Sequence, residues 1–195
     1  MVVMDEFWVD IPEQFYSDAE GKPFEKCVAC GKDLLKEGTP YVIEKAMKNY
    51  EGYNFSSTVF EYAMCLDCYQ EMQKGMSEES MQNLQRFYQD FMEKRGNQPM
   101  MINLQTFDLN DWLSKCFFRE KPVSEMKEYQ LIGQFNGNHL VLNTPPMAIG
   151  EEVMEEMAEL LSEKTRGEMD RFREQFLGPP PEIEELIYGR KILLL

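Results

Sequence analysis

Histidine is nearly absent from this sequence, in which His139 is the only one among 195 residues. Enzymes that activate water or a nucleophile commonly use histidine as a metal ligand or as a general base. A lone histidine beside an expected hairpin turn therefore excludes nucleases of the His–metal type, and we interpret it as an exposed turn residue. The sequence also has no glycine-rich phosphate loop and no nucleophile elbow. We assign no catalytic residue.

Basic residues are scarce relative to acidic ones. The chain contains 20 Lys and Arg against 35 Asp and Glu, a net charge of −15. Residues 1–20 carry six acids and no base, and residues 151–186 carry twelve acids and four bases. Because neutralised phosphates supply most sequence-independent affinity for nucleic acid, this balance disfavours DNA or RNA as a partner. One alternative stays open, a local basic patch formed by Lys22, Lys26, Lys32, Lys36, Lys45 and Lys48.

Long apolar runs are missing as well. No segment reaches the roughly 18 consecutive apolar residues of a membrane-spanning helix, and residues 1–6 lack the basic flank and apolar run of a secretory signal. Five cysteines are too few for a disulfide scaffold in a chain of this size, and four of them occur in two close pairs. We therefore expect a cytoplasmic protein with reduced cysteines and no membrane contact.

The four paired cysteines form the most informative pattern. Cys27 and Cys30 are separated by two residues, as are Cys65 and Cys68, and 34 residues lie between the pairs. A two-residue spacer lets both sulfurs of a pair reach one ion, and zinc in structural sites prefers four tetrahedral ligands. Thiolates are soft ligands that suit zinc better than magnesium or calcium. The spacing predicts one structural Zn²⁺ bound by these four cysteines.

Two other uses of four cysteines are less consistent with the pattern. A redox dithiol needs a single low-pKa Cys-x-x-Cys at a helix start, commonly in a strand–helix–strand unit. An iron–sulfur cluster also takes four thiolates, but its ligands are commonly spaced differently. A catalytic zinc would keep a position open for water and usually includes a histidine or a carboxylate. The fifth cysteine, Cys116, is expected to be a buried free thiol.

The order of elements around the cysteines carries a resemblance. Cys27, Cys30 and Gly31 form a turn, a hairpin follows, and Cys65 and Cys68 begin a helix. This arrangement, over about residues 24–74, resembles a treble-clef zinc finger, and the resemblance implies a knuckle, a β-hairpin and a helix around one zinc. The wider pattern, with CVACGKDLL, YVIEKA and FEYAMCLDC, also resembles uncharacterised bacterial proteins, which imply no function.

Periodicity predicts the elements of the N-terminal half. Apolar and β-branched residues predict strands over 41–47 and 58–64, joined by an unusually long connection. A helix is expected from the second cysteine pair onwards, interrupted at Gly75. A second helix has Ser77 as its N-cap and Gly96 just beyond its end, with apolar residues at helical spacing.

The C-terminal half predicts a second hairpin and a long helix. A short helix is expected near 110–113, and Asn136-Gly137-Asn138 predicts the turn of a hairpin over 129–142. An acidic helix over 151–177 would be about 40 Å long if unbroken, with Gly167 as a candidate bend. Its glutamates lie mainly opposite its apolar stripe, which indicates a solvated face; a docking surface for a basic partner is the alternative.

These elements together predict an α+β fold in three regions. We expect an acidic aromatic N-terminal arm over 1–20, a treble-clef zinc module with an extended helix over 21–96, and a mixed helix and hairpin region over 97–195. The arm should pack its aromatic residues onto the main body, and the apolar tail 192–195 should pack as a strand or helix end.

The leading functional hypothesis is a non-enzymatic adaptor whose partner is another protein, steered by acidic charge towards basic partners. Fifteen methionines, several of them on helical apolar faces, are expected to pack in the core, with a protein-binding groove as the alternative. The alternative function is an enzyme with a carboxylate-based site between the zinc module and residues 129–177. The partner and the oligomeric state are not predicted.

Overall fold

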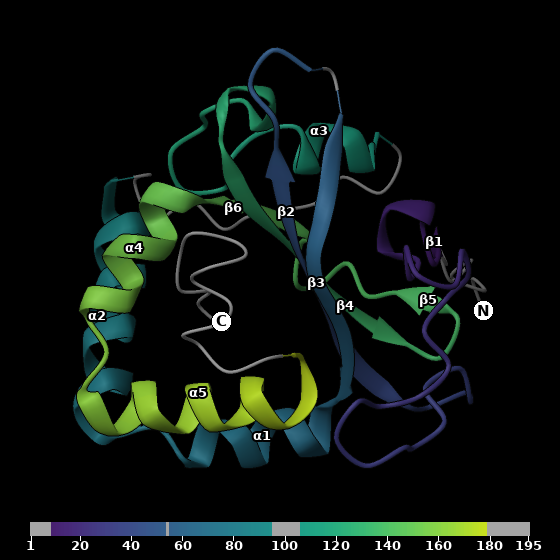
Figure 1. The fold of residues 1–195 in the computed structure, drawn as a ribbon, viewed down its shortest axis with the longest axis horizontal. Coiled ribbons are helices and arrows are strands. Elements are labelled where there is room, and N and C mark those ends of the chain that lie inside the picture. Colours follow the sequence, from purple (N-terminus) through teal and green to yellow (C-terminus); the bar gives the residue numbers. More distant parts are fainter. Residues whose placement is uncertain (1–8, 54, 95–105, 179–195) are drawn as a thin grey trace, which may run out of the picture.

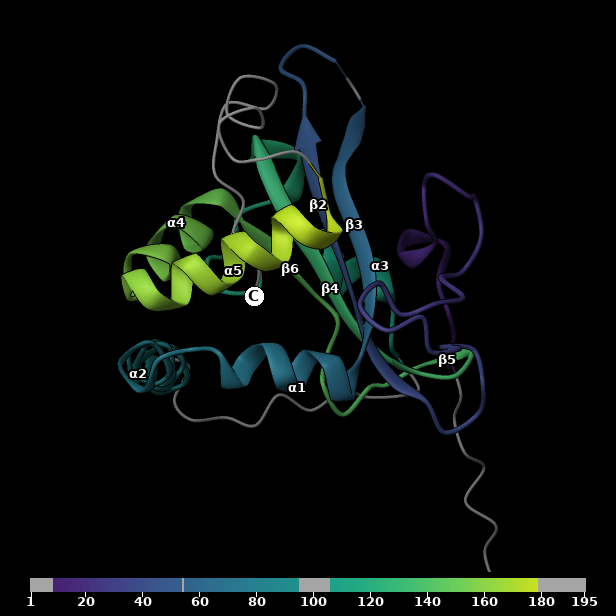
Figure 2. The ribbon, with the colours of Figure 1, turned by 60° about the horizontal axis from the view of Figure 1, so that its bottom comes forward.

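The central element of the structure is a long hairpin of two ten-residue strands. The structure is a computed structural model and describes residues 9–53, 55–94 and 106–178. Strands β2 (Pro40–Asn49) and β3 (Ser56–Cys65) pair antiparallel, with a register shift between Ala46 and Met47. Both predicted strands are confirmed, and each is a few residues longer than expected. Figure 2 shows the β2–β3 turn projecting beyond the helices.

The second hairpin joins the same sheet. Strand β4 (Glu128–Asn136) lies along the other edge of β2 through nine residue pairs, and β5 (His139–Leu140) returns after the predicted turn. Strand β6 (Met147–Gly150), which the sequence did not predict, also pairs with β4, and β1 (Val9–Asp10) pairs with β5. The described residues thus form a six-stranded antiparallel sheet and five α-helices, which confirms the mixed helix and sheet class.

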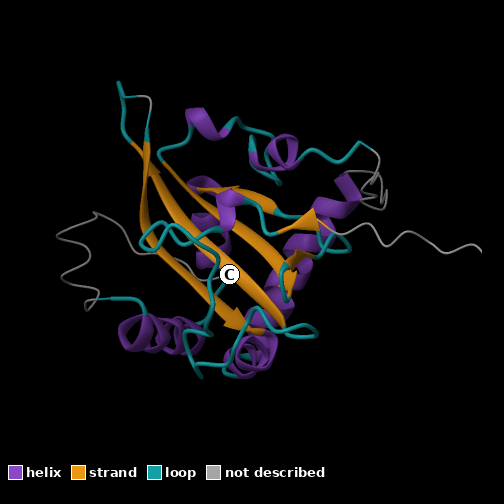
Figure 3. Cartoon of the chain, turned by 90° about the vertical axis from the view of Figure 1, so that its right-hand side faces the viewer, coloured by secondary structure: helices purple, strands orange, loops and turns teal. Residues whose placement is uncertain are grey.

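Both faces of the sheet are covered, which explains why β2 is buried at six successive residues. On one face Tyr62 packs its ring against Phe172, with centroids 5.7 Å apart. On the other face the fully buried Phe15 packs against Phe135 at 5.2 Å. Figure 2 shows the larger helices on the first face and the N-terminal segment on the second, and Figure 3 shows the sheet running through the middle of the molecule.

Helices α1 (Leu66–Lys74) and α2 (Glu78–Lys94) follow β3 directly (Figure 1). The interruption predicted at Gly75 is confirmed, since Gly75 is the C-cap of α1. The predicted N-cap of α2 is also confirmed, because the Ser77 hydroxyl accepts the N–H of Ser80 at 3.1 Å. The short helix α3 (Leu109–Leu113) lies where it was expected. Predicted features outside the described residues are the aromatic residues of 1–8, Gly96 and the tail 192–195.

The prediction of one acidic helix over 151–177 is wrong. The segment forms α4 (Glu151–Glu159) and α5 (Glu163–Phe176), and the break lies at residues 160–162, whereas Gly167 is inside α5. Ser162 causes the break: its hydroxyl accepts the N–H of Thr165, and its own N–H donates to the Ser80 hydroxyl at 2.8 Å. A serine that caps a new helix and bonds to a neighbouring helix stabilises a turn that periodicity alone does not reveal.

Candidate metal centre

The four paired cysteines meet at one point. Their Sγ atoms all lie within 4.8 Å of one another, and the Sγ atoms of Cys30 and Cys65 are 3.7 Å apart. Four thiolates at about 2.3 Å from a tetrahedral zinc would be about 3.8 Å from each other. Among the described residues this tetrad is the group of cysteine, histidine and acidic side chains whose ligand atoms converge closely enough to hold a metal ion.

The first pair lies on a tight turn fastened to the sheet. The turn closes through the N–H of Gly31, which donates to the carbonyl of Cys27 at 2.9 Å, and Gly31 has a φ of +70°. That left-handed conformation favours glycine, because a Cβ would crowd the backbone. The N–H of Val28 donates to the carbonyl of Ala63 at 2.9 Å. This bond places the turn against β3, beside the second pair.

The second pair lies at the junction of a strand and a helix. Cys65 is the last residue of β3 and the N-cap of α1, and Cys68 lies in the first turn of that helix. Helix N-termini carry partial positive charge and unbonded N–H groups, both of which favour a thiolate. The start of α1 is therefore suited to hold negatively charged sulfur.

Burial and hydrogen bonds shift the pKa values of three of the thiols, those of Cys27, Cys65 and Cys68. Burial opposes ionisation of Cys27, but backbone N–H groups of Cys65, Cys30 and Ala29 lower its pKa to about 7. The Cys65 N–H lies 3.4 Å from the Cys27 sulfur. Burial and the neighbouring thiols raise the pKa of Cys65 and of Cys68. One thiolate therefore forms readily, whereas further ionisation needs a compensating cation, as in a metal site.

Lys32 lies next to the tetrad, but a carboxylate shares its charge. Four thiolates and one divalent ion carry a net charge of −2, and a basic side chain nearby reduces that cost. Lys32 pairs with Asp67 in the first turn of α1, and the pKa of Lys32 is raised by that carboxylate and by Cys65 and Cys30. Lys26, which directly precedes Cys27, pairs with Asp33 at 3.6 Å.

Exposure differs among the ligands. Cys27 and Cys65 are buried, Cys68 is half-buried and Cys30 is exposed. An ion bound here would be buried on the sheet side and reachable from solvent on the Cys30 side. All four tetrahedral positions would be taken by sulfur, so no position would be left for water or substrate.

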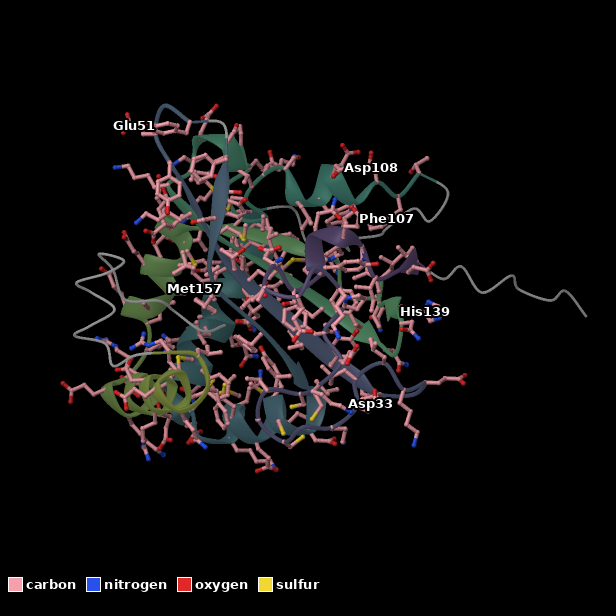
Figure 4. All side chains as sticks on the ribbon, turned by 45° about the vertical axis from the view of Figure 1, so that its right-hand side comes forward. Asp33, Glu51, Phe107, Asp108, His139 and Met157 are labelled. Atoms are coloured by element: carbon pink, nitrogen blue, oxygen red, sulfur yellow. The ribbon has the colours of Figure 1, made fainter. Side chains whose placement is uncertain are left out.

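The other singled-out residues lie apart from the tetrad. Cys116 is buried, as expected, and does not belong to the metal-binding group. His139 lies on β5 with its Nδ1 atom 3.5 Å from an Asp10 carboxylate oxygen, and Figure 4 shows it at the edge of the molecule. A nucleophilic or histidine-based site needs a nucleophile and a base within hydrogen-bond reach of each other. Cys116 and His139 do not form such a pair.

The basic patch considered from the sequence is largely neutralised. Five of its six lysines form ion pairs with carboxylates, and Lys36 is the exception among them. The pairs are Lys22 with Glu20 and Glu25, Lys26 with Asp33, Lys32 with Asp67, Lys45 with Asp18 and Glu61, and Lys48 with Glu128. A lysine held by a carboxylate contributes little to phosphate binding, so the structure does not favour this alternative.

Part of the acidic face of 151–163 forms ion pairs with another segment of the chain. Glu151 and Glu152 pair with Lys121, and Glu156 pairs with Arg119. These contacts tie α4 to the loop that follows α3. The solvated-face prediction therefore needs a correction at Glu151, whose side chain is 13% exposed, whereas Glu152 and Glu156 stay exposed beside their partners.

Sequence reasoning missed a buried lysine. Lys45 is only 3% exposed, and its Nζ donates to the Tyr16 carbonyl at 2.6 Å and to Asp18 at 2.8 Å, with Glu61 at 3.4 Å. The signal was present, since a lysine stood among apolar residues in the run Tyr41–Met47 and β2 is covered on both faces. This cluster fastens the N-terminal segment to the sheet.

An apolar cavity of about 220 Å³ lies among α1, α2, α4 and α5. Half of its described lining is methionine: Met72, Met76, Met81, Met157 and Met169. The sequence left two roles open for the methionines, core packing and a protein-binding groove. Their location does not decide between the two, since these methionines both pack between helices and line a cavity. The described lining contains no carboxylate, and so it does not favour the carboxylate-based enzyme site considered from the sequence.

No protein-family model, curated protein or solved structure matches this chain. No helix in the described part of the chain has the length and apolar character needed to cross a membrane. Any functional assignment therefore depends on the geometry described above.

Proposed function

We propose that the chain is a cytoplasmic protein-interaction adaptor whose N-terminal part is a treble-clef module built around one structural Zn²⁺. Cys27, Cys30, Cys65 and Cys68 would be the ligands. The convergence of their four sulfurs, with one separation of 3.7 Å close to the edge of a zinc–thiolate tetrahedron, carries the proposal. The turn, the β2–β3 hairpin and α1 supply the elements of such a module in the required order.

The all-sulfur donor set supports zinc in a structural rather than a catalytic role. Zinc accepts four thiolates without redox chemistry and leaves the site closed. The N–H groups directed at Cys27 and the helix start at Cys65 would stabilise the thiolate charge. In such a site the metal contributes folding free energy and takes no part in turnover.

The far end of the same hairpin supports the adaptor role. Tyr50, Tyr53 and Phe55 are 39%, 71% and 56% exposed, and the rings of Tyr50 and Phe55 stack with centroids 5.1 Å apart. Figure 4 shows Glu51 in this turn and Asp33, which follows the cysteine turn, at opposite ends of the molecule. Clustered exposed aromatic residues are typical anchors of protein interfaces.

The base of this aromatic turn is held in place. The Asn49 side-chain amide donates to the carbonyls of Val123 and Met126 at 2.9 and 2.8 Å. A held turn loses less conformational entropy when a partner binds, which favours affinity. The net charge of −15 would steer a basic protein towards it.

Two measurements test the proposal separately. Metal analysis by mass spectrometry of the purified chain should find about one zinc per chain, and its absence under non-chelating conditions would overturn the metal assignment. Affinity capture should then compare wild type with Tyr53→Ser/Phe55→Ser and with the control Gln85→Ser, an exposed residue of α2 outside the methionine-rich cavity. A partner retained by the control and lost by the double variant is expected; partners indifferent to both would overturn the adaptor role.

A further inference from the structure

A second cavity, of about 430 Å³, lies along the C-terminal half of α2. It is lined by residues of α2, of the turn 118–120 and of α4, and so it is built from three separate parts of the chain. Small-molecule sites typically measure roughly 300–1,000 Å³ and combine apolar walls with a few polar groups. The size and mixed composition of this cavity meet both conditions.

The floor of the cavity is aromatic. Phe118 is buried, and its ring centroid lies 4.8 Å from that of Phe91 and 5.4 Å from that of Phe87, in edge-on and tilted contacts. All three rings line the cavity, and Phe87 and Phe91 are only partly buried. A planar aromatic ligand could add a further ring to this cluster in the same geometry.

The rim offers one available charge of each sign. Asp90 and Lys94 lie four residues apart on α2, on the same side of the helix, and both line the cavity. In the part of the chain that the structure describes, neither side chain forms an ion pair, whereas Arg119 on the opposite rim is paired with Glu156. A ligand carrying both an ammonium and a carboxylate would complement this rim.

The turn that closes the cavity is strained. Glu120 has a φ of +57°, and among the described residues it is the one non-glycine residue with a positive φ. Its N–H donates to the carbonyl of Cys116 at 2.8 Å, which holds the turn. Strained residues of this kind concentrate at binding sites, where the surrounding structure maintains them. Here the strained turn is the one that directs Phe118 and Glu120 to the cavity.

We propose that this cavity binds a small zwitterionic aromatic molecule of the class of the free aromatic α-amino acids. The ring would pack on the phenylalanine floor, the ammonium would lie near Asp90 and the carboxylate near Lys94. This inference goes beyond the adaptor role and is independent of the metal, because none of the four cysteines lines the cavity.

Isothermal titration calorimetry of the full chain with L-phenylalanine tests the proposal. We expect saturable binding with one site per chain, and binding about two- to fivefold weaker for phenylethylamine and for 3-phenylpropanoate, which each lack one of the two charges. No heat at millimolar ligand would overturn the proposal. Equal binding of all three compounds would overturn the zwitterionic class.

Variants on α2 supply the second arm. Asp90→Asn and Lys94→Met should each weaken binding about fivefold, whereas Glu79→Gln, an exposed acid on the same helix outside the lining, should leave it unchanged. Asp90 and Lys94 are exposed, so neither substitution removes core packing, and unchanged circular dichroism would verify the fold. Binding that falls equally in the control, or in none of the variants, would refute the placement.

Discussion

Removing the metal should open the cysteine turn while leaving the sheet folded. Besides the proposed metal, two hydrogen bonds tie this turn to β3: the Val28 N–H donates to the Ala63 carbonyl, and the Cys65 N–H is directed at the Cys27 sulfur. Hydrogen bonds contribute about 0.5–1.5 kcal/mol each, so these two hold the turn by roughly 1–3 kcal/mol. By contrast, β2 is paired along both edges and buried on both faces, independently of the metal.

Hydrogen exchange measures this difference directly. With metal bound, the Val28 amide should exchange only on global unfolding, which costs about 5–15 kcal/mol in typical domains. After chelation it should exchange by local opening of the turn, which costs at most about 3 kcal/mol. The free energies of global and local opening then differ by at least about 2 kcal/mol, so the Val28 amide should exchange at least roughly 30-fold faster. Amides of β2 and β4 should keep their protection. The reasoning fails if chelation leaves the Val28 amide unchanged, or if it exposes the whole sheet equally.

A matched pair of cysteine variants distinguishes the effect of losing a metal ligand from the effect of losing any buried thiol. Cys68→Ser should reproduce the effect of chelation and lower the metal content well below one ion per chain, since one of four ligands is lost. Cys116→Ser, a buried thiol outside the tetrad, should keep the full metal content even if burying a hydroxyl lowers stability. Equal metal loss in both variants would show that the tetrad is not the site.

Three further predictions follow from particular contacts. Metal affinity should fall at least about 100-fold per pH unit on acidification below pH 8. The reason is that Cys65 and Cys68, whose pKa values are raised, must each release a proton when the metal binds. Competition titrations that show no pH dependence of the affinity would contradict this. Lys45→Met should lower the free energy of unfolding by about 3 kcal/mol, since it leaves the largely buried Glu61 carboxylate without its ammonium. Urea denaturation should show that the double variant Lys45→Met/Glu61→Leu regains part of the lost free energy of unfolding. Equal stability of the single and the double variant would refute the pairing argument. Gly133→Ala should cost about 1–3 kcal/mol, because a Cβ there would lie 2.9–3.0 Å from two buried phenylalanine rings; an unchanged melting temperature would show that the rings adjust freely.

Features set by residues close in sequence were predicted well. The cysteine turn, the β2–β3 hairpin and the start of α1 depend on short spacings, and the turn at Asn136–Asn138 depends on a glycine at positive φ. Ser77 was recognised as an N-cap because it precedes a clear helical pattern. For the candidate site, spacing alone identified all four members of the group that the structure brings together.

Features that depend on distant partners were not predictable. Strand β6 has four residues, too few for periodicity to distinguish a strand from a loop, and only its pairing with β4 defines it. The apolar residues of 151–177 keep helical spacing across residues 160–162, so the sequence pattern continues where the helix does not. The aromatic cavity needs Phe87 and Phe118 to meet across 31 positions, and neither residue has a local signal for that contact.

The placement of α1 explains why a metal would be useful in a chain with a large sheet of its own. None of the nine residues of α1 is fully buried, and the helix packs on the core through the partly buried Cys68, Tyr69 and Met72. Its first turn carries Cys68, and the residue before it is Cys65, so an ion bound by the tetrad would fix its start to the turn at Cys27 and to the end of β3. Tyr69 and Met72, from the next turns, line the methionine-rich cavity. An ion bound by the tetrad would therefore stabilise the position of a helix that has no fully buried residue and, through it, one wall of that cavity.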